Sequence, residues 1–177
     1  MEITPGTKAP DFALRNQHGE TVRLSDFRAG AGDTAGNAGN TGNTGNAGNT
    51  GKNVVLLFFP FAFTGICTGE LCEVRDRLPA FVNKDTQLLA ISNDSPFALR
   101  IFADHEGLEY PLLSDFWPHG EVSRAYGVFN EERGCALRGT FIIDREGVVR
   151  WSVINGMPDA RDLDAYITAL DALREEV

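Results

Sequence analysis

The feature that most constrains the fold of this chain is an unbroken run of six apolar residues at positions 54–59, directly before Pro60. A half-exposed strand alternates polar and apolar residues, whereas a continuous run indicates a strand that is buried on both faces. Segments 87–92 and 140–144 have the same character. The sequence therefore predicts a central sheet that is covered by helices on both sides.

The segments around these strands predict a mixed α/β order. Residues 12–15 and 20–24 flank a polar turn and predict an N-terminal β-hairpin, and segment 148–153 predicts an antiparallel partner for 140–144. The predicted helices are 67–82 with a kink at Pro79, a helix that opens at Ser95-Pro96, a short helix over 122–126, and an amphipathic helix over 159–173.

Residues 30–51 form a compositional insertion made of Gly, Asn, Thr and Ala, with Asp33 as the single exception. Such side chains cannot build a core that offsets the entropy of ordering, so we expect a disordered loop. Both flanks read as structured elements. The chain is therefore expected to be a single domain over 1–177 with a loop inserted at 30–51, since doubling a loop costs only about 0.6 kcal/mol.

Charge and composition exclude several classes of function. The net charge is −9 and no basic run occurs, which argues against nucleic acid and anionic membrane as partners. No apolar run approaches the roughly 20 residues of a membrane-spanning helix. The N-terminal residues lack a secretory pattern, so a cytoplasmic location is expected. Three cysteines in such a chain do not predict a disulfide scaffold.

A thiol, Cys67, is predicted at the start of the helix that follows the apolar strand. Unpaired N–H groups and the helix dipole favour an anion there. A helix terminus contributes only about 0.3–2 kcal/mol, too little to ionise an ordinary thiol at neutral pH by itself. A hydrogen bond from Thr64 and a nearby cation are therefore expected as well. Arg138 is one candidate cation, although the pattern does not select it over other arginines.

Other cysteine chemistries fit less well. The three histidines lie in a turn, near a helix end and beside a proline, which disfavours a Cys–His hydrolase. The C-x4-C spacing of Cys67 and Cys72, with a distant Cys135, lacks the paired ligands of a structural zinc site. No C-x-x-C pair is present, which disfavours a dithiol reductase. We expect neither a metal nor a cofactor.

The segment Pro60-x-x-x-Thr64-x-x-Cys67 is similar to the active-site motif of peroxiredoxins. Over the whole chain except the insertion, the sequence resembles the alkyl hydroperoxide reductase E class of actinobacterial peroxiredoxins. The other segments that carry this resemblance are Ala9-Pro10-Asp11-Phe12, Ser114-Asp115-Phe116-Trp117-Pro118-His119-Gly120, Ala125-Tyr126-Gly127-Val128-Phe129-Asn130 and Arg138-Gly139-Thr140-Phe141.

The resemblance implies a thioredoxin-like fold and a thiol peroxidase that reduces hydrogen peroxide and organic hydroperoxides. Cys67 would be the peroxidatic thiolate and would cycle through a sulfenic acid. Thr64 would hydrogen-bond the thiolate and the peroxide, Arg138 would stabilise the thiolate and polarise the O–O bond, and Pro60 would shield the site from water. Glu70 would orient the arginine, or else is an ordinary acid in the first turn of the helix.

Cys72 departs from the E class and is a candidate resolving residue, because C-x4-C occurs in another subgroup that forms an intramolecular disulfide. Five helical residues rise about 7.5 Å, and a disulfide needs Cα atoms within about 7 Å, so the first turn would have to unwind. A helix cysteine without a redox role is the alternative, and Cys135 is a weaker candidate. A thiol–disulfide oxidoreductase or a redox sensor on the same fold also remains open.

The resemblance also implies partners. Mycoredoxin with mycothiol would be the reductant by analogy with the E class, and thioredoxin would be the donor if Cys72 resolves the sulfenic acid. A homodimer is the family expectation. Trp117 and the phenylalanines are accordingly interpreted as core or dimer-surface residues.

Overall fold

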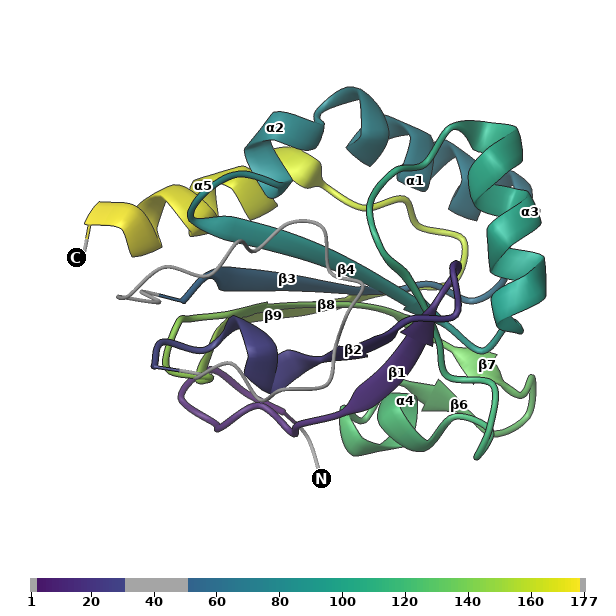
Figure 1. Cartoon of the computed structure of the whole chain (residues 1–177), viewed down its shortest axis with the longest axis horizontal. Coiled ribbons are helices and arrows are strands. Elements are labelled where there is room, and N and C mark those ends of the chain that lie inside the picture. Colours follow the sequence, from purple (N-terminus) through teal and green to yellow (C-terminus); the bar gives the residue numbers. More distant parts are fainter. Residues whose placement is uncertain (1–2, 31–50, 176–177) are drawn as a thin grey trace.

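The computed structural model describes residues 3–30 and 51–175. The predicted insertion at 30–51 therefore lies outside the described residues, apart from Gly30 and Gly51. Within the described part, the centre of the fold is one sheet of seven strands (Figure 1). In chain order these are β1 (Ala13–Asn16), β2 (Thr21–Arg23), β3 (Asn53–Phe58), β4 (Thr86–Ser92), β5 (Leu112–Ser114), β8 (Arg138–Ile143) and β9 (Val149–Asn155).

The order of the strands across the sheet is β2-β1-β5-β4-β3-β8-β9. Strand β3 lies between β4, which is parallel to it, and β8, which is antiparallel, so Val55 faces Leu88 on one side and Ile142 on the other. All residues of β3 are buried. This confirms the expectation of a mixed sheet around a strand that is covered on both faces.

Alternate residues of β3 enter two separate apolar clusters, as the two-residue period of a strand requires. Val55 and Leu57 pack with the layer of helices that lies above the sheet in Figure 1, whereas Val54 and Leu56 pack against the opposite layer. The upper layer contains α1 (Gly65–Asp76), α2 (Leu78–Phe81), α3 (Pro96–Glu106) and α5 (Leu163–Glu175). The lower layer contains α4 (Glu121–Ala125) and the short hairpin of β6 (Phe129–Asn130) and β7 (Cys135–Ala136).

The helix expected over 67–82 is two helices. α1 begins at Gly65, with Thr64 as its N-cap, and ends at Asp76; α2 follows after Arg77. Pro79 explains the break, because it has no N–H to continue the ladder and its ring clashes with the carbonyl four residues before it. The earlier start places Cys67 third in the helix instead of first.

One other boundary differs from expectation, and three short strands are additional. α5 begins at Leu163 and not at residue 159, because the Asp162 side chain accepts the N–H groups of Asp164 and Ala165 and so caps the helix. The short strands β5, β6 and β7 were not predicted. The predicted start of α3 is confirmed, since Ser95 Oγ accepts from Ala98 N at 3.2 Å and Pro96 is the first helical residue.

The two ends of the insertion lie together. The 3₁₀ turn η1 (Leu24–Phe27) precedes the insertion, and Lys52 N donates to Phe27 O at 2.8 Å. Gly51 has a left-handed φ of +72°, and a Cβ there would lie 2.5 Å from Ala29 N. The described residues on either side of the insertion therefore lie next to each other. None of the described helices is long and apolar enough to cross a membrane.

Candidate active site

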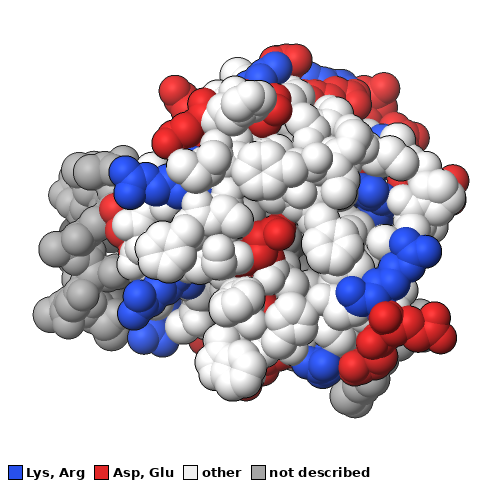
Figure 2. All heavy atoms as spheres, turned by 90° about the vertical axis from the view of Figure 1, so that its right-hand side faces the viewer, with Lys and Arg blue, Asp and Glu red and all other residues white. Residues whose placement is uncertain are grey.

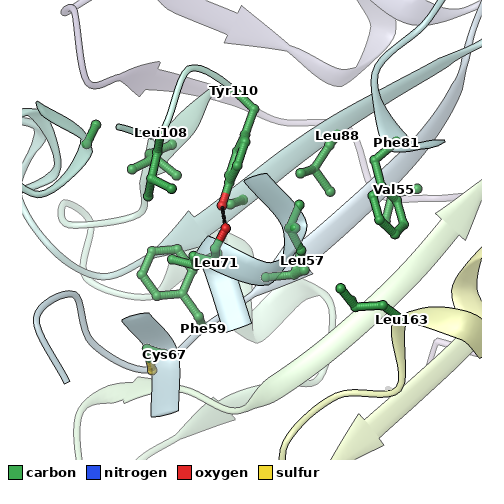
Figure 3. Packing of buried hydrophobic residues seen from close by; sticks show 14 of the residues in the cluster. Val55, Leu57, Phe59, Cys67, Leu71, Phe81, Leu88, Leu108, Tyr110 and Leu163 are labelled. Carbon is green, nitrogen blue, oxygen red and sulfur yellow. Dashed lines mark hydrogen bonds between the residues drawn. The ribbon is translucent and has the colours of Figure 1, made fainter. Parts of the chain in front are cut away.

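Cys67 is the third residue of α1, and its side chain is fully buried. It belongs to the same apolar cluster as Phe59 and Leu71 (Figure 3). The first intrahelical bond runs from Thr68 N to Thr64 O at 2.9 Å. In the described part of the chain, the N–H groups of the three residues before Thr68 make no hydrogen bond. They are the unpaired donors that make a helix N-terminus a site for an anion.

The loop over residues 60–64 joins β3 to α1. Pro60 is buried, whereas Thr64 is exposed and donates its hydroxyl hydrogen to Phe61 O at 3.0 Å. The expected bond from Thr64 to the sulfur is therefore not made in this state. Phe63 has a φ of +66°, a left-handed conformation that costs a bulky residue about 1–3 kcal/mol. Its ring packs edge-on against Phe102, with the centroids 5.1 Å apart.

Arg138 of β8 and Glu70 of α1 form a buried ion pair. Arg138 Nη1 lies 2.8 Å from Glu70 Oε2, and the two side chains are 4% and 5% exposed. Glu70 is three residues after Cys67, so both project from the same face of α1. Arg138 Nε donates to Met157 O at 2.7 Å, and its Nη2 has no hydrogen-bond partner among the described residues. The structure thus pairs Arg138 with Glu70, one turn after Cys67 on α1, and leaves one donor of Arg138 unused.

A second arginine, Arg161, also binds Glu70, and reasoning from the sequence missed it. Its backbone N–H donates to Glu70 Oε1 at 3.0 Å, and its Nε donates to Glu70 Oε2 at 3.2 Å. It also donates to Thr140 Oγ1 at 2.7 Å and to the carbonyls of Gly139 and Phe58. The only sequence signal is an isolated arginine in an acidic segment that lies within the helix predicted over 159–173.

The three side chains leave an excess of positive charge around Glu70, one helical turn after Cys67. Two guanidinium groups face one carboxylate, and all three are nearly closed to solvent. A charge interacts more strongly in such surroundings than in water. The group formed by Glu70, Arg138 and Arg161 is therefore suited to stabilise a negative charge that develops on the sulfur.

Cys72 lies on the same helix but has different surroundings. Its Sγ donates to Glu106 Oε2 at 3.4 Å. Burial, followed by the hydrogen bond to Glu106, raises the pKa of the Cys72 thiol above its ordinary value. α1 is continuous from Gly65 to Asp76, so a bond between Cys67 and Cys72 requires its first turns to open.

Cys135 is buried in β7, three residues before Arg138. Burial is the main cause of its raised pKa; Arg133 opposes that rise, and the nearby Cys67 adds to it. The two thiols therefore lie within electrostatic range of each other. No hydrogen bond among the described residues joins any of the three histidines to Cys67. Over residues 3–30 and 51–175, no three His, Cys, Asp or Glu side chains are grouped to hold a metal ion.

Comparison with known proteins decides the family. The AhpC/TSA family model matches residues 31–152, more than half of the chain. This chain belongs to the AhpC/TSA family. It is 46% identical over 171 residues to alkyl hydroperoxide reductase E of Mycobacterium tuberculosis, a match that covers 97% of this chain and 98% of that protein. It is also 34% identical to a putative peroxiredoxin of Synechocystis, with 96% and 78% covered.

Solved structures agree with this assignment. Peroxidoxin BcpB from Mycobacterium tuberculosis gives a TM-score of 0.75 at 28% identity and covers 97% of this chain and 98% of its own. The AhpC of Enterococcus faecalis gives 0.73 at 26% identity, with 98% and 93% covered. These matches confirm the thioredoxin-like fold and the assignment of this chain to the peroxiredoxins of the alkyl hydroperoxide reductase E class. The protein is a thiol-dependent peroxidase.

Proposed function

We propose that Cys67 is the thiol that reduces the peroxide and that its substrates are hydrogen peroxide and organic hydroperoxides. The Cys67 thiolate attacks the terminal peroxide oxygen, the S–O bond forms as the O–O bond breaks, and the alkoxide or hydroxide leaves and takes up a proton. Cys67 is then a sulfenic acid. The observation that carries this proposal is the buried Glu70–Arg138 pair beside a thiol at a helix N-terminus.

Negative charge moves from the sulfur to the leaving oxygen in this step, so fixed donors near that oxygen lower the barrier. The free Nη2 of Arg138 and the unpaired N–H of Cys67 are suited to this task. The Thr64 hydroxyl joins them when it turns from Phe61 O to the peroxide. Pro60, the buried first residue of the loop over 60–64, keeps water from the sulfur.

Glu70 and Arg161 support the reaction through Arg138. Glu70 accepts from both arginines, and this fixes the guanidinium of Arg138 with Nη2 unpaired. Arg161 adds the second positive charge that outweighs the carboxylate. Glu70 is thus an orienting residue in this proposal and not merely an acid in the first turn of α1.

The sulfenic acid is reduced by an external thiol, with mycoredoxin and mycothiol as the proposed donors. The support is the continuous α1 and the contact of Cys72 with Glu106, both of which disfavour a direct bond from Cys67 to Cys72. Family members act with thiol reductants, and thioredoxin is the alternative donor if Cys72 resolves the sulfenic acid. The cytoplasm is the proposed compartment, because all three cysteines are free thiols.

A homodimer is supported by an apolar face at the right-hand side of Figure 1. Figure 2 shows that this face is mostly neutral, with aromatic rings at its surface and most charged groups near its edges. Phe97 and Trp117 are both 82% exposed. Exposed apolar patches of this kind mark interaction sites. The other large apolar residues exposed on α3, on the loops next to it or at the start of α1 are Phe61, Phe63, Ile66, Ile101 and Phe116.

Rapid mixing with substoichiometric peroxide tests the role of Cys67. The wild-type chain should consume peroxide far faster than a free thiol does, and Cys67→Ser should abolish this reaction. Equal rates for the two proteins would refute the proposal. Intact mass after one equivalent of peroxide then identifies the product: a gain of one oxygen indicates the sulfenic acid, and a loss of two hydrogens indicates a disulfide.

A further inference from the structure

One hydrogen bond connects the loop before Cys67 to the turn that follows the neighbouring strand β4, and Asp94 in that turn accepts it. Ala62 N donates to Asp94 Oδ2 at 2.9 Å. Among the hydrogen bonds of the described residues, no other joins residues 60–64 to a different element. The Thr64 hydroxyl bonds within the loop to Phe61, and the Thr64 carbonyl bonds within α1.

Asp94 is itself fixed by the carboxyl ends of two parallel strands. Ser92, the last residue of β4, donates its hydroxyl hydrogen to Asp94 Oδ2 at 2.7 Å. Ser114, the last residue of β5, donates to the backbone carbonyl of Asp94 at 2.6 Å. The carboxylate is therefore presented to the loop by rigid elements, which is how a functional group is positioned accurately.

The loop needs such an external contact. Phe63 has a left-handed backbone that bulky residues seldom adopt, so the loop would relax to another conformation if its surroundings did not prevent it. Thr64, the next residue, is the N-cap of α1. A change in the loop therefore moves the Thr64 hydroxyl relative to the sulfur of Cys67.

We propose that Asp94 is a positioning residue for peroxide reduction, whose carboxylate fixes the loop that presents Thr64 to Cys67. The inference rests on the proposed role of Cys67. Asp94 does not touch the peroxide in this scheme. It acts as a hydrogen-bond acceptor through one oxygen, Oδ2, so the neutral and nearly isosteric asparagine can replace it: the amide oxygen in the place of Oδ2 accepts from both Ala62 N and the Ser92 hydroxyl.

The test compares two reactions of Cys67 in Asp94→Ala, Asp94→Asn and the control Asp85→Ala. Asp85 directly precedes β4, at the opposite end of that strand from Asp94, and pairs with Arg145. The first reaction is the oxidation of Cys67 by hydrogen peroxide, measured in stopped flow. This reaction needs the Thr64 hydroxyl to be oriented toward the sulfur. The second is alkylation by iodoacetamide, located on Cys67 by tandem mass spectrometry, which needs the thiolate but not Thr64.

Asp94→Ala should slow the oxidation about 10- to 100-fold, the effect of displacing a reacting group by about 1 Å. Its alkylation should stay near the wild-type rate. Asp94→Asn and Asp85→Ala should resemble the wild type in both reactions. Normal oxidation of Asp94→Ala overturns the proposal, as does an equal slowing of both reactions or an Asp94→Asn variant as slow as Asp94→Ala. A wild-type chain no faster than Cys67→Ser would instead refute the role of Cys67 itself.

Discussion

Arg138 and Glu70 meet at 2.8 Å between β8 and α1, almost completely shielded from solvent, and Arg161 binds the same carboxylate. Glu70→Gln removes the one negative charge that faces two guanidinium groups. Loss of one partner from a buried pair destabilises a protein by about 3–5 kcal/mol, because the remaining charge is buried without compensation. We expect a loss of this size in urea denaturation.

Glu73→Gln is the matched control for this prediction. Glu73 lies on the same helix, but it is exposed, and it forms an ion pair in which Arg77 Nη1 lies 3.8 Å from Glu73 Oε1. Water screens such a pair, so the free energy of unfolding should barely change. Equal effects of the two substitutions would show that Glu70 does not contribute through a buried ion pair.

Arg138→Lys keeps the positive charge and removes the planar fork. A lysine ammonium cannot bind Glu70 and Met157 O and also present a further donor with the fixed geometry of a guanidinium. We expect the second-order rate constant with hydrogen peroxide to fall by about 100-fold, near the lower end of the range for loss of one donor to a developing oxyanion. Stopped flow measures it. The exposed Arg133→Lys serves as the control, and a normal rate for Arg138→Lys would remove the arginine from the mechanism.

Cys72 should be a slow nucleophile at neutral pH. Burial and the Glu106 carboxylate both disfavour its thiolate and raise its pKa, so alkylation of Cys72 should reach half its maximal rate at a higher pH than a free thiol. Glu106→Gln removes a negative charge and should move this midpoint to lower pH. Mass spectrometry resolved by residue follows the reaction. Glu109→Gln, at an exposed position, should leave the midpoint unchanged. If Glu106→Gln has the same midpoint as the wild type, the Glu106 carboxylate does not raise the pKa of Cys72.

The apolar face at the carboxyl ends of β4 and β5 predicts where two copies associate. Trp117→Glu places a charge on a residue that is 82% exposed, and we expect sedimentation velocity to show a monomer at concentrations where the wild type is a dimer. Ala172→Glu is the control, because Ala172 is exposed on α5, and that helix lies on the left-hand side of Figure 1, away from this face. A dimer that survives Trp117→Glu places the interface elsewhere.

The elements that the sequence predicts well are those whose pattern is local. The continuous apolar run of β3 and the Ser95-Pro96 signal of α3 each determine their own structure. The break at Arg77 is less visible, because the apolar spacing continues across it and only the ring of Pro79 prevents a hydrogen bond there. The strand β5 is too short for a pattern and forms because β4 and β1 pair with it.

The site also contains residues that a local motif predicts and residues that only the tertiary fold brings together. Cys67 and Thr64 share one short motif, so their proximity follows from the helix that begins between them. Arg161 lies 91 residues from Glu70, and the contact depends on how the segment before α5 returns to the sheet. Asp94 also lacks a motif. Its contact with Ala62 exists because β3 and β4 are parallel neighbours whose carboxyl ends meet.

Removal of residues 31–50 should leave the peroxidase intact. Lys52 N bonds to Phe27 O at 2.8 Å and Ala29 N bonds to Arg145 O at 2.9 Å, so the two ends are already adjacent and Gly30 can join Gly51 through a short turn. Each halving of a loop's length lowers the entropic cost of closing it by about 0.6 kcal/mol. We expect an unchanged rate of Cys67 oxidation and an equal or slightly higher Tm, measured by stopped flow and calorimetry. A large loss of activity in a variant that keeps its Tm would show that the insertion contributes to the reaction.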